Sequence, residues 1–231
     1  MRTLAIGDVH GCSAVLDTLL AAVRPAAGDR LVFLGDYVDR GPDSRGVIDR
    51  VITLSRTHDV VALRGNHELM MQRARGDRAD FRMWTSVGGL QTLGSYGPAP
   101  GRSGTLADVP AEHWKFLEET CRDYFETDTH IFVHATVYPD LPLENQPELM
   151  LFWEFLDKDR PIAHESGKTV VCGHTSQKSG EILDLETAVC IDTYAYGGGW
   201  LTCLDVGSGR YWQANILGKV RTGILGHPRE G

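Results

Sequence analysis

The sequence predicts an α/β fold in which short buried strands alternate with amphipathic helices. Short apolar runs recur along the chain, and each leads into a polar cluster that contains Gly, Asp, Asn or His; they are Thr3–Ile6, Leu31–Leu34, Val60–Leu63, Ile131–Val133 and Thr169–Cys172. Helical patterns lie between the first of them, at Ser13 to Val23 and Ser44 to Ser55. Runs this short are typical of strands buried on both faces, and their alternation with helices indicates βαβ units.

The later elements follow from local composition. Residues 69–128 are predicted to form a helical insertion with Gly-rich breaks, in which Pro110 to Tyr124 makes one amphipathic helix. Residues 181–215 contain strand-like segments separated by Gly-rich turns, which indicates an antiparallel part of the core. The tail from Gly218 is expected to fray. Since the strand pattern resumes after the insertion, we expect one domain over residues 1–231.

Composition excludes several classes of protein. The chain has 231 residues, of which 42% are hydrophobic and 23% charged, as in globular proteins and unlike disordered ones. A net charge of −8 argues against a general nucleic-acid binder, which needs a basic surface. The apolar runs are too short to cross a membrane. The five cysteines form no CxxC pair, and the first residues do not resemble a signal peptide, so we expect a cytoplasmic protein.

Polar side chains gather at the predicted strand ends. They are carboxylates, imidazoles and one amide, at Asp8, His10, Asp36, Asp39, Asn66, His67, His134 and His174. Ligands bind at the carboxyl ends of strands in such sheets, so we expect all of them along one edge. This mixture of donors suits Mn²⁺, Fe²⁺ or Zn²⁺ better than Ca²⁺, which prefers oxygen alone. Six of these residues are enough to hold two cations that share one carboxylate, an arrangement that clamps a phosphoryl group.

The order of these clusters resembles a known family. Gly7-Asp8-Val9-His10-Gly11, the segment from Gly35 to Gly41 and Gly65-Asn66-His67-Glu68 are similar to the three signature motifs of the phosphoprotein phosphatase family within the calcineurin-like metallophosphoesterases. The segments around His134 and His174 are similar to its two later histidine motifs. The likeness is greatest to small bacterial and phage serine/threonine phosphatases. It implies a β-sandwich flanked by helices in four layers, αββα.

The resemblance also implies the metal ligands. Two divalent cations, with Mn²⁺ expected first and Fe²⁺ or Zn²⁺ as alternatives, would share Asp36. The remaining ligands would be Asp8 and His10 on one cation, and Asn66, His134 and His174 on the other. A hydroxide shared by both cations would attack phosphorus in line, without a covalent enzyme intermediate.

Roles in catalysis and substrate binding are implied in the same way. His67 would donate a proton to the leaving oxygen, and Asp39 would orient its imidazole. Arg40 would grip a phosphate oxygen with its guanidinium group, and Asn66 would also lie against the phosphate. Tyr194 is a further candidate for contact with substrate.

Three enzymatic functions fit these residues. The first is a phosphatase for phosphoserine and phosphothreonine in proteins, which the intact Asp39-Arg40 pair favours. The second is a hydrolase of small phosphates such as diadenosine tetraphosphate, and the third is a phosphodiesterase. Phe155 stands where the resembling phosphatases have a second phosphate-binding arginine, which favours the phosphodiesterase unless Arg160 replaces that arginine. A non-catalytic module is not expected, because no ligand or catalytic residue has been lost.

Overall fold

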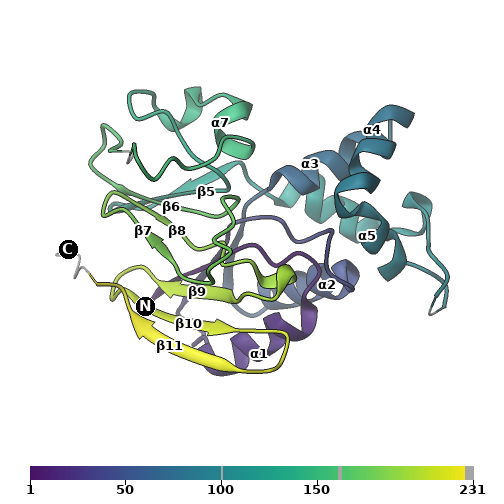
Figure 1. The fold of residues 1–231 in the computed structure, drawn as a ribbon, viewed down its shortest axis with the longest axis horizontal. Coiled ribbons are helices and arrows are strands. Elements are labelled where there is room, and N and C mark those ends of the chain that lie inside the picture. Colours follow the sequence, from purple (N-terminus) through teal and green to yellow (C-terminus); the bar gives the residue numbers. More distant parts are fainter. Residues whose placement is uncertain (100, 161–162, 227–231) are drawn as a thin grey trace.

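Two mixed β-sheets pack face to face, and helices cover their outer faces (Figure 1). The computed structural model describes residues 1–99, 101–160 and 163–226. The arrangement confirms the predicted four-layer αββα fold. It differs from the single edge expected for the strand ends, because the five predicted strands are divided between the two sheets.

The first sheet has six strands in the order β11-β10-β9-β1-β2-β3. The strands β1, β2 and β3 are parallel, with Ile6 opposite Phe33 and Phe33 opposite Ala62, so they end at one level. The other three continue the sheet in antiparallel pairs. The bounds are β1 (Thr3–Ile6), β2 (Arg30–Phe33), β3 (Asp59–Ala62), β9 (Leu201–Asp205), β10 (Arg210–Ala214) and β11 (Val220–Ile224).

The second sheet has five strands in the order β4-β5-β6-β8-β7. Its centre is parallel, with Phe132 opposite Val171 and Cys172 opposite Cys190, and its two edge strands are antiparallel. The bounds are β4 (Tyr124–Glu126), β5 (His130–Val133), β6 (Thr169–Cys172), β7 (Leu183–Asp184) and β8 (Ala188–Cys190).

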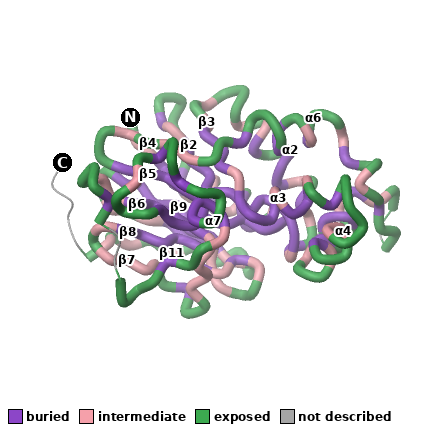
Figure 2. The backbone as a smooth tube through the Cα atoms, turned by 90° about the horizontal axis from the view of Figure 1, so that it is seen from above, coloured by how far each residue is buried: buried purple, intermediate pink, exposed green. Residues whose placement is uncertain are grey.

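Side chains that point alternately to the two faces of each strand separate the core between the sheets from the layers of helices outside them. Ala5 on β1 packs between the sheets with residues such as Phe132 of the other sheet, whereas its neighbours Leu4 and Ile6 pack against the helices of the first sheet. Successive side chains of a strand point to opposite faces, so a strand covered on both sides is apolar throughout. Figure 2 shows the buried residues running through the strands of both sheets.

The helices lie outside the sheets. The outer face of the first sheet is covered by α1 (Ser13–Val23) and α2 (Ser44–Ser55). The second sheet is covered by α7 (Glu148–Phe152), which follows the short turn η4 (Leu143–Asn145). Another short turn, η5 (Ala195–Gly197), lies before β9. No helix in the described ranges is both long enough and apolar enough to pass through a bilayer.

A helical segment projects beside the two sheets (Figure 1). It begins at Asn66 and ends at Thr120, and Tyr124–Glu126, which we had placed in the insertion, forms strand β4 of the second sheet. Its elements are α3 (Asn66–Arg73), α4 (Arg78–Trp84), η1 (Thr85–Gly89), α5 (Leu90–Ser95), η2 (Leu106–Asp108), α6 (Ala111–Lys115) and η3 (Phe116–Thr120). The helix expected from Pro110 to Tyr124 is α6 continued by η3.

The tail expected to fray from Gly218 instead contains β11. This strand pairs with β10 over five residue pairs, from Arg210 opposite Ile224 to Ala214 opposite Val220. Gly218 lies in the turn of this hairpin with a φ of 71°, a conformation that suits glycine. The glycine therefore marks a hairpin turn and not the end of ordered structure.

Candidate functional site

Six strand ends of the two sheets meet at one side of the sandwich. Asp8 follows β1, Asp36 follows β2 and Asn66 follows β3 in the first sheet; His134 follows β5, His174 follows β6 and Asp192 follows β8 in the second. Contacts join the two groups. The backbone N–H of His174 donates to a carboxylate oxygen of Asp8 at 3.1 Å, and His134 Nδ1 lies 2.8 Å from the carbonyl oxygen of Leu34. The structure thus brings all six predicted metal ligands together, in a cluster that spans both sheets.

Two carboxylates form the centre of this cluster. Asp8 and Asp36 are both buried. Burial, together with the negative charges of Asp192 and Asp36, raises the pKa of Asp8 well above its usual value. Burial alone would also raise the pKa of Asp36, but His134, His67, His10 and His174 outweigh it and hold that pKa well below its usual range. Two buried carboxylates that share a site are stabilised either by protonation of one of them or by positive charge between them, which a bound cation would supply.

The imidazoles are oriented so that a nitrogen lone pair faces this centre. The Nδ1–H group of His10 donates to the carbonyl oxygen of Val38 at 2.9 Å, and that of His134 donates to Leu34. Their Nε2 atoms consequently lack a proton in the neutral ring, yet they lie 3.3 Å and 3.5 Å from the carboxylate oxygens of Asp36. Burial lowers the pKa of His10 well below its usual value, which favours the neutral ring. Lone pairs that face carboxylate oxygens in this way suit a bound cation.

His174 reaches the cluster in the opposite orientation. Its Nε2 lies 3.1 Å from the carbonyl oxygen of Trp153, so Nε2 carries the proton and Nδ1 has the lone pair. Burial and the neighbouring His134 lower the pKa of His174 to about 4. The ring is therefore neutral at pH 7, as a metal ligand must be.

The donor set fits divalent cations. Two triplets of side chains have ligand atoms that all lie within 4.8 Å of one another, His10 with Asp36 and His67, and Asp8 with Asp36 and His134. Asp36 belongs to both triplets, as a carboxylate shared by two cations would. The triplets divide the other residues differently from the prediction, because His67 was not expected as a ligand and Asp8 and His134 were expected on different cations. The amide oxygen of Asn66 lies 3.0 Å from His134 Nε2 and adds a further oxygen donor. Carboxylate, imidazole and amide donors together suit Mn²⁺, Fe²⁺ or Zn²⁺.

Beside the cluster, His67 and Asp39 form a buried pair. His67 Nδ1 lies 2.6 Å from Asp39 Oδ2, and Asp39 has no exposed surface. Burial disfavours the charged imidazole, but the carboxylates of Asp36 and Asp39 outweigh it and raise the pKa of His67. Trp84 Nε1 donates to both oxygens of Asp39, at 2.9 and 3.0 Å, and the hydroxyl of Thr92 donates to Oδ1 at 2.7 Å. The helical segment, which carries Trp84 and Thr92, thereby fixes the carboxylate that holds His67.

Arg40 lies next to this pair. Its guanidinium Nη1 is 3.0 Å from His10 Nε2, and the group sits over the ring of Tyr196 at 4.6 Å. Tyr196 also packs edge-on against His10, with ring centroids 4.9 Å apart. Tyr194, the tyrosine named from the sequence, packs against Tyr196 and is not among the residues that line the pocket at the site. The tyrosine that lines the pocket beside Arg40 is therefore Tyr196, whereas the candidate named from the sequence was Tyr194.

Glu68 organises the loop between β2 and α2, although no role was predicted for it. Its buried carboxylate accepts hydrogen bonds from four backbone N–H groups, those of Asp36, Tyr37, Val38 and Gly65, at 2.8–3.2 Å. Burial and the charge of Asp36 raise its pKa to about 7. Asp36 has a φ of 51°, a left-handed conformation that is costly for residues other than glycine. Glu68 offsets this cost by accepting hydrogen bonds from the backbone N–H groups of Asp36, Tyr37 and Val38.

Asp192 is a second residue that was not predicted. Its carboxylate and its carbonyl oxygen connect it to the loop after β6: the hydroxyl of Ser176 donates to the carboxylate, and Gln177 N donates to the carbonyl oxygen at 2.8 Å. Burial raises the pKa of this carboxyl group. The signal was present in the sequence, because Asp192 follows the apolar run Val189-Cys190-Ile191 just as the predicted residues follow their strands.

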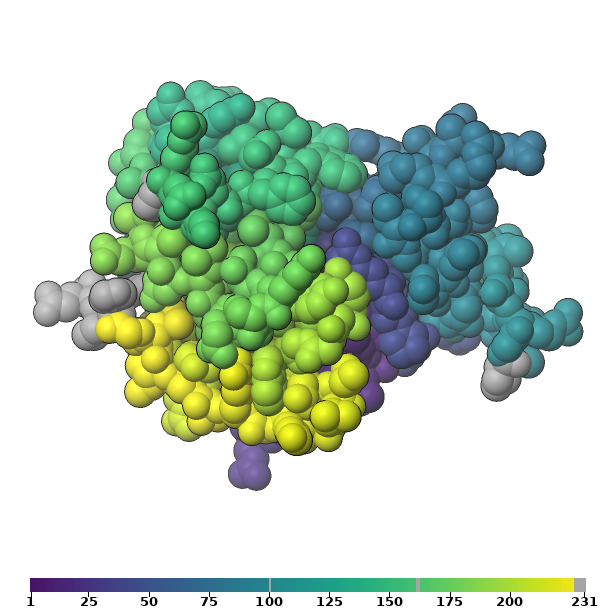
Figure 3. Space-filling model, in the orientation of Figure 1, coloured from purple at the N-terminus to yellow at the C-terminus, as the bar shows by residue number. Residues whose placement is uncertain are grey.

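A pocket of about 450 Å³ opens over the cluster. Its lining includes Asp36, Asn66 and Arg40 from the first sheet, Phe155, His174 and Lys178 from the second, and Tyr196. The ring of Phe155 stacks on that of His174 at 4.9 Å and is 63% exposed. Arg160, proposed above as a replacement for an arginine at position 155, does not line the pocket, whereas Lys178 does. In Figure 3 a gap separates the helical segment from the rest of the molecule, and residues from the first quarter of the chain are seen within it.

Comparison with protein families matches residues 1–178 to the calcineurin-like phosphoesterase family. This match covers more than half of the chain and includes every predicted metal ligand. The chain belongs to the calcineurin-like phosphoesterase family. It is therefore a hydrolase of the metallophosphoesterase type, whose dinuclear centre agrees with the donor set described above.

Two kinds of curated relative are similar in sequence. The serine/threonine-protein phosphatase 1 of Salmonella typhimurium is 31% identical over 202 residues, which are 85% of this chain and 88% of that protein. The symmetrical bis(5'-nucleosyl)-tetraphosphatase of Ralstonia nicotianae is 48% identical over 136 residues, which are 58% of this chain and only 42% of that protein. The chain thus spans nearly the full length of the first relative and less than half of the second.

Solved structures agree on the calcineurin-like fold. A putative diadenosine tetraphosphatase is 21% identical, with a TM-score of 0.64 over 96% of this chain and 93% of that one. A protein serine/threonine phosphatase from Saccharomyces cerevisiae is 16% identical, with a TM-score of 0.63 over 99% of this chain and 81% of that one. At these identities the likeness establishes the fold alone.

Proposed function

We propose that this calcineurin-like phosphoesterase is a metal-dependent phosphomonoesterase that acts on phosphoserine and phosphothreonine in proteins. The observation that carries the proposal is the buried His67–Asp39 pair, with 2.6 Å between Nδ1 and Oδ2. A serine or threonine alkoxide is a poor leaving group and needs a proton as it departs. A histidine whose pKa is raised by neighbouring carboxylates keeps its proton to higher pH than a free imidazole and is suited to supply that proton.

The proposed metal ligands are the six predicted from the sequence. Asp36 lies between the two sets and is shared, Asp8 and His10 belong to the first, and Asn66, His134 and His174 belong to the second. Two divalent cations held there, for which we propose Mn²⁺, would neutralise the phosphate and activate water for attack on phosphorus. Glu68 and the carbonyl oxygens of Val38 and Leu34 keep these side chains in position.

The remaining roles belong to the His67–Asp39 pair beside the cluster and to two residues that line the pocket, Arg40 and Asn66. Asp39 holds His67 with Nδ1 protonated, so Nε2 presents its proton toward the leaving oxygen. The guanidinium of Arg40 lines the pocket and donates to phosphate oxygens, while Tyr196 supports its flat face. Asn66 lines the same pocket and is placed to contact both a cation and the phosphate.

A hydrolase of small nucleotide phosphates is the second candidate. Two observations favour it: the 48% identity to the Ralstonia nicotianae tetraphosphatase over 136 residues, and the exposed ring of Phe155 at the pocket, on which a base can stack. The coverage of the Salmonella typhimurium phosphatase, 88% of its length, favours the protein phosphatase.

The decisive experiment compares substrates on one preparation of enzyme. Protein stripped of metal is titrated with Mn²⁺ and assayed on a phosphothreonine peptide, an aryl phosphomonoester, an aryl phosphodiester and a dinucleoside tetraphosphate. We expect rates on the peptide and the monoester to rise until about two Mn²⁺ ions are bound. Efficient cleavage of the tetraphosphate with a negligible rate on the peptide would establish the second candidate instead.

A further inference from the structure

We propose that Lys178 is a substrate-binding residue of this site and supplies the second cationic contact to the phosphoryl group, from the side of the second sheet. The inference rests on the proposed phosphomonoesterase and adds a residue that neither the sequence motifs nor the dinuclear cluster includes. It is carried by the composition of the pocket, by the anchoring of the turn that holds Lys178, and by the charge at the site.

The pocket is built from both sheets, but its cations are few. Among the described residues that line it, only Arg40 and Lys178 carry a permanent positive charge. Arg40 comes from the loop after β2, in the first sheet. Lys178 comes from the loop after β6, in the second sheet, four residues beyond His174. A phosphate in the pocket therefore meets one cationic side chain from each sheet.

The backbone around Lys178 is fixed on both sides. Gln177 N donates to the carbonyl oxygen of Asp192 at 2.8 Å, and Gly180 N closes a turn onto the carbonyl oxygen of Gln177 at 2.9 Å. The carbonyl oxygen of Gly180 in turn accepts from the side chains of Gln213 and Arg221, at 3.1 and 2.6 Å. The turn is thus attached to β8 on one side and to the β10–β11 hairpin on the other.

Lys178 itself is exposed at the tip of this turn. This turn is fixed at both ends and holds the long side chain of Lys178 at the rim of the pocket. The ammonium group can therefore reach a phosphate in the pocket and still keep much of its hydration. Lysine acts as a point charge, so it needs less exact alignment than the fork of an arginine.

The charge at the site explains why a second cationic side chain would strengthen phosphate binding. Two divalent cations in the cluster would carry four positive charges, of which the buried carboxylates of Asp8, Asp36 and Asp192 would balance three. Because a phosphomonoester arrives as a dianion, negative charge would remain for cationic side chains to meet. One face of the Arg40 guanidinium is already covered by the ring of Tyr196. On the side of the second sheet, His174 is covered by Phe155, which has no charge to offer. Lys178 is the lining residue that provides positive charge on that side.

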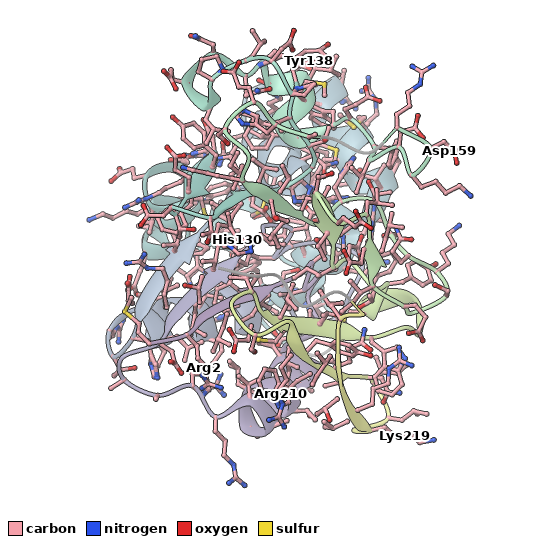
Figure 4. The ribbon with its side chains drawn as sticks, turned by 90° about the vertical axis from the view of Figure 1, so that its left-hand side faces the viewer. Arg2, His130, Tyr138, Asp159, Arg210 and Lys219 are labelled. Carbon is pink, nitrogen blue, oxygen red and sulfur yellow. The ribbon has the colours of Figure 1, made fainter. Side chains whose placement is uncertain are left out.

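The test removes this charge and keeps the side-chain stem. Lys178→Met is compared with Lys219→Met, which removes an exposed lysine at the tip of the β10–β11 hairpin (Figure 4) and leaves the pocket unchanged. We expect Lys178→Met to raise KM for an aryl phosphomonoester about tenfold, the loss of one charge-assisted contact, with kcat changed less than about threefold. The effect on a monoanionic phosphodiester should be smaller. Lys219→Met should behave as the unchanged protein.

A rescue variant separates charge from structure. Phe155→Arg, made in the Lys178→Met background, places a cation on the same wall of the pocket and should recover most of the lost KM. If Lys178→Met has the same KM as Lys219→Met, or if the defect is equal for monoester and diester, the proposal is wrong.

A binding measurement keeps this test independent of the substrate. Inorganic phosphate is titrated into the Mn²⁺-loaded protein by calorimetry, and Lys178→Met should bind it about tenfold more weakly than Lys219→Met. If none of the chosen esters is hydrolysed by the unchanged protein, the proposed function fails, yet weakened phosphate binding by Lys178→Met still supports the role of Lys178. Equal phosphate affinity in the two variants overturns that role whatever the substrate.

Discussion

Replacing Asp39 by Asn tests whether His67 acts as an acid. The carboxylate accepts from three groups, His67 Nδ1 at 2.6 Å, Trp84 Nε1 at 2.9 Å and the Thr92 hydroxyl at 2.7 Å. An Asn side chain has one oxygen, which can keep the bonds from Trp84 and Thr92. Its NH₂ group then faces His67 Nδ1, which has to become an acceptor. His67 is forced into the neutral ring with its proton on Nε2, and it loses the charge that raised its pKa.

The expected fall in kcat of Asp39→Asn follows from the loss of general-acid catalysis by His67. A positioned general acid contributes about 10² to 10⁴ in rate. We therefore expect kcat on a phosphothreonine peptide to fall by about 10² to 10⁴, because its alkoxide cannot leave without a proton. An aryl phosphate with an acidic phenol as leaving group needs little protonation, so its kcat should fall less than about tenfold. Stability should change by about 1 kcal/mol, since two of the three hydrogen bonds to residue 39 remain.

The assay measures kcat for both substrates from pH 5 to pH 9, with bound metal determined on the same samples. In the unchanged protein, the rate on the peptide should fall as the pH rises through the raised pKa of His67, because the acid loses its proton. In Asp39→Asn this alkaline limb should disappear. Trp84→Phe, which removes one donor to Asp39 and keeps an aromatic ring, is the matched control and should cost far less. An equal loss on peptide and aryl phosphate, at full metal content, would refute the role of His67 as the acid.

Three further predictions concern the cluster and the stability of the fold. Asp36→Asn should weaken binding of Mn²⁺ by more than about 100-fold, because the shared ligand is lost; metal analysis after gel filtration measures this, and full metal content would contradict the shared site. Glu68→Gln should lower the free energy of unfolding by about 2–4 kcal/mol, because its NH₂ group leaves two of the four bonded N–H groups without an acceptor; denaturant unfolding tests this, and an unchanged midpoint speaks against it. Asp29→Asn should cost about 1 kcal/mol at pH 7 after allowance for solvent screening at the partly exposed Arg2. Since Arg2 holds the pKa of Asp29 well below its usual value, this stability is present at neutral pH and is lost as the pH falls below about 4. The free energy of unfolding of Asp29→Asn should therefore decrease less steeply below that pH than that of the unchanged protein. The same pH dependence in both proteins would contradict the prediction.

The predicted strands were found because burial leaves a clear pattern. Thr3–Ile6 and Thr169–Cys172 are apolar on both faces, and both became strands covered on both sides. The two parts of the chain that were misplaced lack this signal. Tyr124–Glu126 is a short edge strand of intermediate exposure, and β11 alternates exposed and half-buried residues along the outer edge of its sheet. Edge strands are specified by the neighbour with which they pair, and that neighbour lies elsewhere in the sequence.

The candidate site shows the same division. The residues directly after buried strands, such as Asp8 and His134, were named from the sequence because the end of a buried strand is itself a local pattern. Glu68 and Lys178 were not named as members of the site. Glu68 lies inside a helix, and only the fold brings the loop of Asp36 to Val38 onto its carboxylate. Lys178 is an exposed lysine in a turn, and only the folded structure places it at the wall of the pocket where we propose that phosphate binds.

The sequence by itself indicated the family, the buried strands and the polar side chains that follow them, because each of these depends on residue types at short spacing. Tertiary structure decided how the ligands divide between two sheets, which nitrogen of each histidine faces the centre, and which side chains complete the pocket. The orientation of His174 depends on the carbonyl oxygen of Trp153. The pocket is lined by Tyr196 and Lys178, whereas two candidates named from the sequence, Tyr194 for substrate contact and Arg160 as a replacement for an arginine at position 155, do not line it. Such choices follow from contacts between distant segments, and the free energy of those contacts exists only once the chain has folded.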